Sequence, residues 1–391
     1  MPSGTDVVAL VLAGGRGSRL EPLTDARPKP AVPFAGTYRL IDITLSNLAN
    51  SGIRDVWVVE QYRANILNRH LAGGRPWDLD GTRRGLRILP PVEGDLDDGF
   101  AKGNGHALFQ QLEALEEHGS RTVIVLSADH LYLLDLRQVL AQHWERASDL
   151  TIVTTVVDED PSRYGAVKAD DAGRVVDYNY KPSDPDDRVV STEVLVFEVS
   201  ALKGAVDALR EPGSDGSDLG DYGESIIPHL VEHAVVHEYR MDGYWRDVGT
   251  VDAYFRAHME LIEGTGVELN RPGWPIVSNL RAAPPARIDT HATVTDSLIS
   301  SGATILGEVH HSVIGPGVVV ERGATVSRSV LIGDVVVPSG AQLASVIADH
   351  GVTIPATAVG QTKPGPGNIT VLVGDTDDEG DSLSAAPPQH L

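Results

Sequence analysis

The feature that most restricts the fold of this 391-residue chain is a repeat of about six residues in its C-terminal part. Small residues and glycines separate the apolar members of the repeat, which are Val294, Ile299, Ile305, Ile314, Val320, Val326, Leu331 and Val337. A period of about six with glycine turns is typical of a parallel β-helix, in which each apolar residue stacks on one in the coil below. A β-sandwich with coincidental spacing is the alternative, but the repeat continues to Ile354 and Val359. We therefore predict a β-helix over residues 289–363.

Before the repeat, over residues 1–263, apolar runs of strand length alternate with segments of helix-like apolar spacing, such as residues 107–118. Runs that are apolar on both faces suit a buried parallel sheet covered by helices. The four clearest runs are residues 7–12, 56–59, 122–126 and 150–157. This pattern predicts a doubly wound α/β domain. Residues 264–288, which contain several prolines and glycines, are the predicted linker to the β-helix.

Acidic residues dominate the charge of the chain, because 55 Asp and Glu against 32 Lys and Arg give a net charge of −23. This balance argues against a nucleic-acid partner, although a few local cations suffice for small phosphorylated ligands. The absence of cysteine excludes disulfides, thiolate metal sites and cysteine nucleophiles. We expect no membrane partner and a cytoplasmic location, because the N-terminus lacks a basic signal region and no apolar stretch approaches the ~20 residues of a membrane span.

The last part of the chain differs in composition from both predicted domains. After Lys363 it turns to proline, glycine and acids, with five acidic residues and no basic one between Asp375 and Asp381. A segment of this kind cannot bury enough apolar surface to fold. We expect residues 364–391 to form an acidic disordered tail.

The motif that carries chemistry follows the first apolar run, where residues 13–20 read AGGRGSRL. Glycines there allow the backbone to approach a ligand and present N–H groups to phosphate oxygens. The motif is neither a P-loop nor a dinucleotide fingerprint, because the Walker lysine and the third glycine are missing. Leu23 and Thr24 follow, and then residues 27–31 read RPKPA. Together these stretches strongly resemble the signature of the sugar-nucleotide pyrophosphorylases.

The reaction of that family explains the residue types. A sugar 1-phosphate oxygen attacks the α-phosphorus of a nucleoside triphosphate and pyrophosphate leaves, so positive charge is needed where negative charge moves onto the leaving group. Arg16 and Lys29 are the candidates for this catalytic role, and the alternative is that both are ordinary surface cations. Their position at or after a glycine loop that ends a strand favours the catalytic role.

Two acids are candidates for binding a metal ion, and the first is also predicted to be catalytic. Asp129 follows the apolar run 122–126, so it lies at a carboxyl end of the predicted sheet, where doubly wound folds bind ligands. Asp247 lies in residues 243–250, which read GYWRDVGT. Two separate carboxylates suit Mg²⁺, which also takes oxygens from substrate phosphates. The alternative for Asp129 is a buried salt bridge, and we expect His130 to be structural, because the attacking phosphate oxygen is already anionic and needs no base.

Further stretches resemble the ADP-glucose pyrophosphorylases of bacterial glycogen synthesis, and the resemblance covers roughly residues 6–360. They are residues 29–34 (KPAVPF), 38–42 (YRLID), 45–47 (LSN), 50–54 (NSGIR), Gln61-Tyr62, Leu269-Asn270 and 274–276 (WPI). This resemblance implies a left-handed parallel β-helix, a homotetramer, Mg²⁺ as cofactor, and conversion of ATP and α-D-glucose 1-phosphate to ADP-glucose and pyrophosphate.

The same resemblance implies roles for individual residues. The nucleotide-binding residues it implies are Leu12, Ala13, Gly14, Gly15, Gln61 and Gly103. The implied sugar-phosphate-binding residues are Gly165, Lys181 and Ser191. Arg39 lies where the family places part of an effector site.

The sugar side of the predicted site departs from the family pattern at three positions. Ala101 stands where the family has a tyrosine, Tyr180 stands where it has a glutamate that grips sugar hydroxyls, and Glu193 replaces a glycine. A site that hydrogen-bonds a hydroxyl discriminates strongly, so these changes should relax or change specificity. Two alternatives stay open: the same reaction with another sugar 1-phosphate or nucleotide, and a non-catalytic regulatory subunit that assembles with an active paralogue. An acetyltransferase built on the β-helix, with His310 and His311, is a further alternative.

Overall fold

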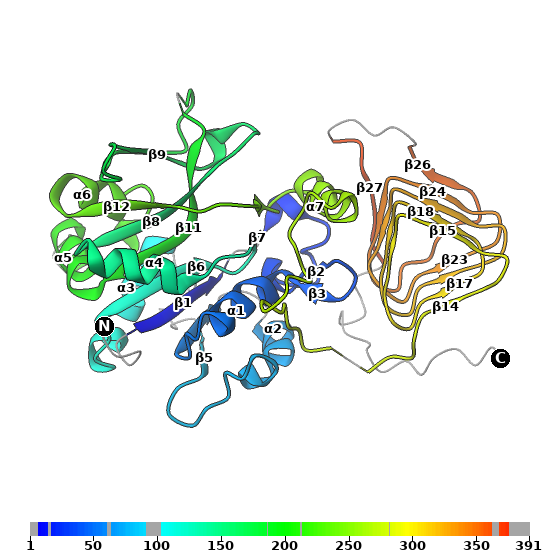
Figure 1. Ribbon diagram of the computed structural model, residues 1–391, viewed down its shortest axis with the longest axis horizontal. Helices are drawn as coiled ribbons and strands as arrows, with labels where there is room; N and C mark the ends of the chain where they lie inside the picture. The colour runs from blue at the N-terminus through cyan, green and yellow to red at the C-terminus, as the bar shows by residue number, and fades with distance from the viewer. Residues whose placement is uncertain are drawn as a thin grey trace.

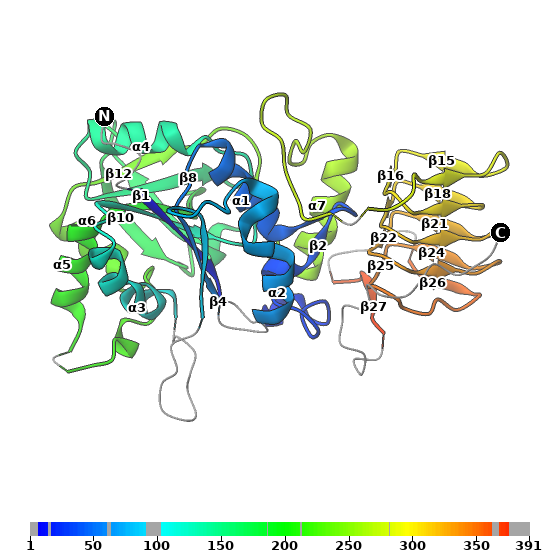
Figure 2. The ribbon, with the colours of Figure 1, turned by 90° about the horizontal axis from the view of Figure 1, so that it is seen from below.

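The protein forms two bodies that lie side by side, an α/β part and a β-helix (Figures 1 and 2). The computed structural model describes residues 7–14, 17–60, 64–90, 103–185, 187–211, 213–280, 282–361 and 367–374. The α/β part ends with helix α7 (Val251–Glu263), and the β-helix begins with strand β14 (Arg287–Ile288). Among the described residues between these two elements, none lies in a helix or a strand.

A nine-stranded sheet forms the centre of the α/β part. Its strands are β1 (Val7–Ala13), β4 (Val56–Glu60), β5 (Leu86–Leu89), β6 (Thr122–Ser127), β8 (Leu150–Val156), β9 (Gly165–Ala169), β10 (Val175–Tyr180), β11 (Val189–Glu198) and β12 (Val236–Arg240). Their order is β10-β9-β11-β6-β1-β4-β5, with β8 beside β11 and β12 beside β8. β1 runs parallel to β4 and β6, and β4 runs parallel to β5, as the apolar runs predict.

The other half of the sheet differs from the parallel arrangement that the apolar runs suggest. β11 runs antiparallel to both β6 and β8, so the predicted run at residues 150–157 joins the sheet through an antiparallel neighbour. An apolar run reports burial on both faces of a sheet, which is the same for either strand direction. The direction of β11 was therefore not visible in the hydrophobic pattern.

Helices cover both faces of this sheet. Helices α1 (Leu40–Asn50), α2 (Ala64–Leu71) and α4 (Leu136–Glu145) pack in one apolar cluster with Val11 of β1. Helices α3 (Asn104–Glu117), α5 (Val199–Leu209) and α6 (Ile226–His233) pack in another with Leu10. Because consecutive side chains of a strand point to opposite faces, β1 is buried on both, as expected for a doubly wound domain.

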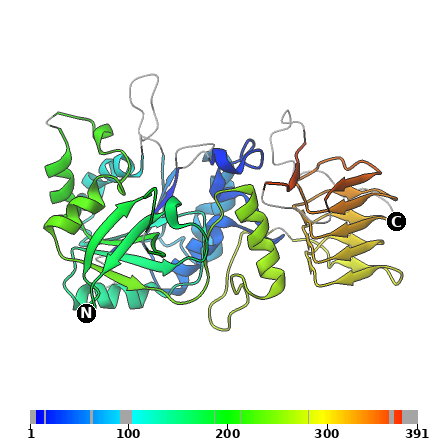
Figure 3. The same cartoon turned by 90° about the horizontal axis from the view of Figure 1, so that it is seen from above.

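The C-terminal body is a β-helix whose coils stack in register (Figures 2 and 3). Val294 pairs with Val309, Val309 with Val326, Val326 with Leu343, and Leu343 with Val359. The predicted stacking of apolar residues is confirmed, and three parallel sheets consistent with a left-handed β-helix result. The first sheet contains β14, β17 (Thr304–Ile305), β20 (Val319–Val320) and β23 (Val336–Val337). The second contains β15 (Thr293–Thr295), β18 (Glu308–His310), β21 (Thr325–Ser327), β24 (Gln342–Ala344) and β26 (Ala358–Gly360). The third contains β16 (Leu298–Ile299), β19 (Val313–Ile314), β22 (Val330–Leu331), β25 (Val346–Ala348) and β27 (Thr370–Leu372).

Strand β27 corrects the expectation that the chain is disordered from residue 364. It pairs in parallel with β25, and its side chains Val371 and Leu372 pack on the apolar clusters of the β-helix. These apolar residues lie just before the acidic run and supply the burial that the run lacks. The acidic residues 375–391 lie outside the described residues.

The two bodies share an apolar core and a buried ion pair. Leu20, Phe34 and Tyr254 of the α/β part belong to one cluster with Val330 and Ile347 of the β-helix. Next to it, Arg27 Nη1 lies 2.9 Å from Asp349 Oδ1, with both side chains less than a tenth exposed. The β-helix is therefore packed directly on the segment that leads to Lys29. No helix within the described ranges has the length and apolarity needed to cross a membrane.

Candidate active site

Three charged side chains from distant parts of the chain meet near the carboxyl end of β6. Lys29 lies in a short 3₁₀ helix (Lys29–Ala31), Asp129 lies two residues after β6, and Asp247 ends strand β13 (Trp245–Asp247), which pairs with β7 (His130–Tyr132). Lys29 Nζ is 2.7 Å from Asp129 Oδ2 and 3.1 Å from Asp247 Oδ1. The structure thus brings together the predicted catalytic cation and both predicted metal ligands.

All three groups are held in their charged forms. Burial alone would lower the pKa of Lys29, but the adjacent carboxylates of Asp129 and Asp247 outweigh it and raise that pKa. Burial would raise the pKa of both aspartates, yet the Lys29 ammonium, with His130 as the next contribution, holds the pKa of each carboxyl below its usual range. A permanently positive atom is therefore fixed between two permanent carboxylates.

Further side chains support the two carboxylates. The His130 ring donates from Nδ1 to the backbone oxygen of Thr192 at 3.1 Å, and its Nε2 lies 3.8 Å from both Asp129 Oδ1 and Asp247 Oδ1. This geometry fits a positioning residue. The hydroxyl of Ser127 donates to Asp129, and Arg163 Nη2 lies 3.5 Å from Asp247 Oδ2. Sequence reasoning missed Arg163, which ends the short 3₁₀ helix Pro161–Arg163 after β8 and carried no motif.

A cavity of about 160 Å³ opens beside this cluster and joins it to the glycine loop. Its lining combines Leu12 and Gly14 of the predicted nucleotide site with Lys29, Asp129 and Asp247. The other lining residues are Arg19, Asn104, Ser127, His130, Glu193 and Tyr222. Three further predicted residues, Gly15, Arg16 and Gln61, lie outside the described residues.

Ala13 and Gly103 complete the described part of the predicted nucleotide site. Ala13 ends β1 beside Gly14 and is in register with Glu60 of β4. Gly103 precedes helix α3 with φ of 127°, and a Cβ atom there would lie 2.3 Å from the backbone oxygen of Gly220. Only glycine fits this position, where it sets the start of α3 and places Asn104 at the cavity.

Comparison with known proteins agrees with this geometry. Residues 8–264 match the nucleotidyl transferase family, and residues 284–363 match the GlmU-like C-terminal hexapeptide family. A glucose-1-phosphate adenylyltransferase of Thermotoga neapolitana is 41% identical over 325 residues, which are 82% of this chain and 76% of the relative. The chain belongs to the glucose-1-phosphate adenylyltransferase family.

Two more relatives with the same name support this membership. The protein of Thermomicrobium roseum is 41% identical over 356 residues, covering 84% of this chain and 82% of its own. The protein of Clostridioides difficile is 37% identical over 334 residues, which are 85% of this chain and 86% of the relative. The resemblance stated from the motifs is thereby confirmed.

The residues that the family resemblance assigns to the sugar phosphate lie at one end of three neighbouring strands. Gly165 of β9 pairs with Tyr180 of β10, Lys181 follows it, and Ser191 of β11 is adjacent through the pairing of Val190 with Ala166. Gly165 is packed against Tyr178, whose hydroxyl would lie 2.3 Å from an added Cβ atom. None of these three sugar-side residues lines the cavity of Lys29 and the aspartates.

Two of the departures from the family pattern are placed at this site, and Ala101 lies outside the described residues. The Tyr180 hydroxyl donates to Asp221 Oδ2 at 2.6 Å, and Lys181 Nζ donates to the same hydroxyl. Glu193 lies in an irregularity of β11 between Ser191 and Leu195, has φ of 59°, and lines the cavity. Burial, which His130 offsets only in part, raises the pKa of Glu193. Relative to the family pattern, this chain therefore loses one carboxyl group at Tyr180 and gains one at Glu193.

Arg39, the predicted effector residue of the adenylyltransferase, lies away from the cavity. It precedes helix α1 and donates from Nη1 to the Ala31 backbone oxygen at 3.3 Å. The hairpin of β2 (Pro33–Phe34) and β3 (Tyr38–Arg39), which ends at Arg39, packs on the β-helix: a Cβ on Gly36 would meet Ser300. Arg39 therefore lies near the contact between the two bodies.

The carboxylate pair fits Mg²⁺ by its donor chemistry. Within the described ranges, no group of three or more His, Asp or Glu side chains forms a complete metal cage. Asp129 and Asp247 nevertheless both reach one cation, the Lys29 ammonium, within 3.1 Å. Mg²⁺ is typically bound by one or two carboxylates together with substrate phosphates, so this pair is sufficient.

Proposed function

We propose that this chain transfers the adenylyl group of ATP to α-D-glucose 1-phosphate, which gives ADP-glucose and pyrophosphate. The observation that carries the proposal is the buried cluster of Lys29, Asp129 and Asp247 beside the glycine loop, in a chain about 40% identical to relatives named for this reaction. We extend the substrates of those relatives to this chain because five of the residues predicted to bind the nucleotide, the triphosphate or the metal line one cavity. These residues are Leu12, Gly14, Lys29, Asp129 and Asp247.

The reaction is a single in-line displacement at the α-phosphorus. An oxygen of the sugar 1-phosphate forms a new bond to this phosphorus, while the bond to the bridging oxygen breaks and its electron pair leaves with pyrophosphate. Lys29 supplies a fixed positive charge for the negative charge that develops, and Arg16 of the glycine loop supplies a second. The nucleophile is already anionic, so His130, held by Thr192, orients the carboxylates and removes no proton.

Asp129 and Asp247 would hold Mg²⁺ together with oxygens of the triphosphate. When bound, the ion neutralises phosphate charge. Leu12, Ala13, Gly14, Gly15, Gln61 and Gly103 would bind the nucleotide, and Gly165, Lys181 and Ser191 the sugar phosphate. These assignments rest on the family motifs and on the positions described above.

A second candidate is the same reaction with a different sugar 1-phosphate. Tyr180 supplies a hydroxyl where the family has a carboxylate, and that hydroxyl is already engaged by Asp221 and Lys181. Glu193 places a carboxyl group in the cavity where the family has none. Both changes alter which sugar hydroxyls can be paired, which is the kind of change that shifts specificity.

The decisive experiment follows pyrophosphate release from purified protein with Mg²⁺, ATP and glucose 1-phosphate. UTP, GTP and dTTP replace ATP in parallel, and galactose, mannose and glucosamine 1-phosphates replace the glucose ester. We expect release that is specific for ATP and glucose 1-phosphate. Release with another pair instead would support the same reaction with a different substrate, as in the second candidate. Absence of release with every pair would refute both and favour a regulatory subunit, to be tested by copurification with an active paralogue.

One variant tests the assignment of Asp129. Asp129→Asn keeps the shape and removes the charge, so we expect turnover to fall by about 10²-fold or more with the fold intact. Asp177→Asn, on the exposed side of β10, is the matched control and should keep normal activity. Near-normal activity of Asp129→Asn would contradict the proposed role.

We further propose a cytoplasmic homotetramer whose effector site includes Arg39. The support is the family resemblance together with the position of Arg39 near the packed contact of the two bodies. Light scattering of the purified protein tests the subunit number. A monomer at micromolar concentration would contradict it.

A further inference from the structure

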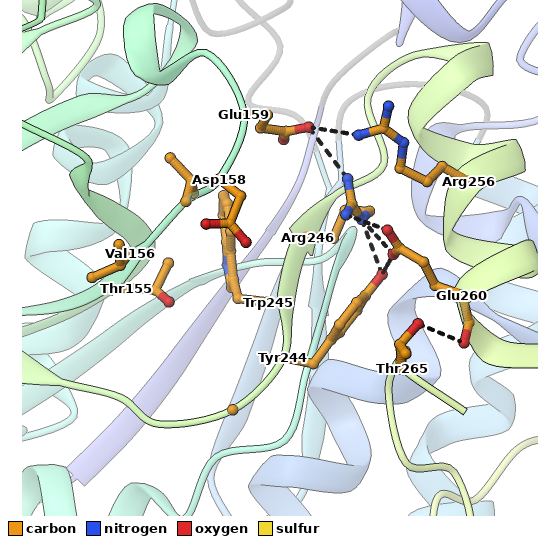
Figure 4. A pocket seen from close by; sticks show the side chains of 12 residues that line it. Thr155, Val156, Asp158, Glu159, Tyr244, Trp245, Arg246, Arg256, Glu260 and Thr265 are labelled. Atoms are coloured by element: carbon orange, nitrogen blue, oxygen red, sulfur yellow. Dashed lines mark hydrogen bonds and ion pairs between the residues drawn. The ribbon is translucent and has the colours of Figure 1, made fainter. Parts of the chain in front are cut away.

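A second cavity, of about 390 Å³, lies beside β13, the strand that ends at Asp247 of the candidate active site (Figure 4). Three parts of the chain line it: the end of β8 with the loop after it, the turn before β13 with β13 itself, and helix α7 with the turn after it. It shares no lining residue with the cavity of Lys29 and the aspartates. Its size is in the range of small-molecule sites.

One wall of this second cavity is a closed network of charges. Arg246 forms two hydrogen bonds with Glu260, from Nε at 2.9 Å and from Nη2 at 2.7 Å, and a third from Nη1 to Glu159 at 3.3 Å. The Tyr244 hydroxyl donates to the same Glu260 carboxylate at 2.8 Å. Figure 4 shows these side chains converging on one side of the cavity. Because these groups satisfy one another, they form a rigid wall and are not free to bind a ligand.

The groups left open on the cavity are of opposite charge. Arg256 is 58% exposed, and its only described ion pair is a long one, 3.8 Å to Glu159. The Asp158 carboxylate has no hydrogen bond or ion pair with any described residue, while its backbone oxygen is fixed by Arg188 at 2.7 Å. One cation is therefore presented by helix α7 and one anion by the loop after β8.

Two further features of the lining bear on the chemistry of a ligand: an exposed apolar side chain and a buried donor without an acceptor. Val156, which lines the cavity, is 55% exposed at the end of β8. The indole Nε1 of Trp245 is buried and has no acceptor among the described residues, and its side chain also lines the cavity. A buried donor without an acceptor is rare in folded proteins and calls for an acceptor such as a ligand oxygen.

We propose that this second cavity binds a zwitterionic metabolite of the α-amino acid class with an aliphatic side chain. The ligand carboxylate pairs with Arg256, its ammonium pairs with Asp158, and its side chain covers Val156. A dianionic phosphate ester is disfavoured, because the cavity has three acidic side chains, Asp158, Glu159 and Glu260, against two arginines. A zwitterion adds no net charge and uses both open groups.

The site is connected to the catalytic cluster by short contacts. Arg246 directly precedes Asp247 in β13. Glu159 accepts a hydrogen bond from the Tyr164 hydroxyl at 2.8 Å, and the rings of Tyr164 and Trp245 pack edge-on at 5.2 Å. Trp245 packs in the same way on His130. A ligand here contacts the elements that hold Asp247, so we expect it to change the KM for the nucleotide.

Calorimetry of the full chain with L-leucine tests the binding. We expect a Kd of about 1 mM or tighter. The analogues 4-methylpentanoate, which lacks the ammonium, and 3-methylbutylamine, which lacks the carboxylate, should each bind at least about tenfold more weakly. No binding of leucine at about ten times this concentration, or equal binding of either analogue, would overturn the proposal.

Variants separate the site from the rest of the surface. Asp158→Asn and Arg256→Gln should each weaken leucine binding about tenfold or more, whereas Asp177→Asn and Arg83→Gln, which change exposed charges elsewhere, should not. Equal effects of test and control variants would contradict the site. Only the measurement of the KM for the nucleotide rests on the proposed function. An active enzyme that binds leucine without a change in this KM would refute the coupling to Asp247. An inactive protein would leave the result of the binding experiment intact.

Discussion

Removal of the Lys29 charge should destabilise the fold and should also allow the two aspartates to bind Mg²⁺ more readily. Lys29→Met keeps the length of the side chain but leaves the largely buried Asp129 and the buried Asp247 without the ammonium that now lies 2.7 and 3.1 Å away. Removing one partner of a buried ion pair costs about 3–5 kcal/mol. With an m-value of about 3 kcal/mol/M, the urea midpoint should fall by roughly 1 M or more.

Mg²⁺ should restore part of this loss in the variant. The free carboxylates can bind the ion without first displacing an ammonium, so Mg²⁺ at about ten times its Kd should stabilise the variant by about 1.4 kcal/mol, and the wild type by less at the same concentration. The assay is urea unfolding followed by far-UV circular dichroism, with and without Mg²⁺. Lys168→Met, an exposed lysine of β9, is the control and should shift neither curve. An unchanged midpoint for Lys29→Met, or the same Mg²⁺ effect in both proteins, would refute the reasoning.

Three further predictions concern stability. Arg27→Ala should lower the free energy of unfolding by about 3–5 kcal/mol because it leaves Asp349 buried and unpaired. In a double-mutant cycle followed by urea unfolding, the variant with both Arg27→Ala and Asp349→Ala should lose less stability than the sum of the two single variants. Burial raises the pKa of Glu60 from 4.5 to about 7, so the folded protein holds this proton more tightly than the unfolded chain and the free energy of unfolding falls as pH rises from 4.5 to 7. Glu60→Gln should therefore raise the free energy of unfolding by on the order of 2 kcal/mol at pH 8 and by little at pH 5. Gly103→Ala should cost about 1–3 kcal/mol through its positive φ and its contact with Gly220, whereas Gly204→Ala, in an open helical position, should stabilise by about 0.5–1 kcal/mol.

The proximity of Lys29 and Asp129 could be predicted from sequence because both residues stand at fixed places in the topology. Asp129 follows a buried strand and Lys29 follows the glycine loop, and carboxyl ends of strands in such sheets meet at one edge. The stacking of Ile305, Val320 and Val337 was likewise visible, since a repeat of fixed period records a repeated local structure.

Features that depend on strand direction or on a single long contact could not be predicted. Glu193 enters the cavity through an irregularity in β11, and the antiparallel direction of that strand leaves no trace in the hydrophobic pattern. Arg163, which ends the 3₁₀ helix Pro161–Arg163, reaches Asp247 across 84 residues of sequence, a long-range contact that no local pattern records. Strand β27 was missed because three residues are too few to show a period, and only the β25 edge beside them makes a strand there.

The position of the β-helix on the α/β part bears directly on the chemistry. Arg27 is two residues before Lys29, and its guanidinium is held by Asp349 of the β-helix, so the segment that carries the proposed catalytic lysine is fixed at one end by the other body. At its other end, Pro33 accepts a hydrogen bond from the hydroxyl of Tyr254, which lies in the shared apolar core. The segment of Lys29 is therefore held between an ion pair to the β-helix and a hydrogen bond to helix α7, whereas Asp129 follows a strand of the central sheet. Because a hydrogen bond weakens quickly beyond its normal length while Coulomb attraction falls only as 1/r, the hydrogen bonds of 2.7 and 3.1 Å from Lys29 to the two aspartates are the contacts that depend most on this double anchoring.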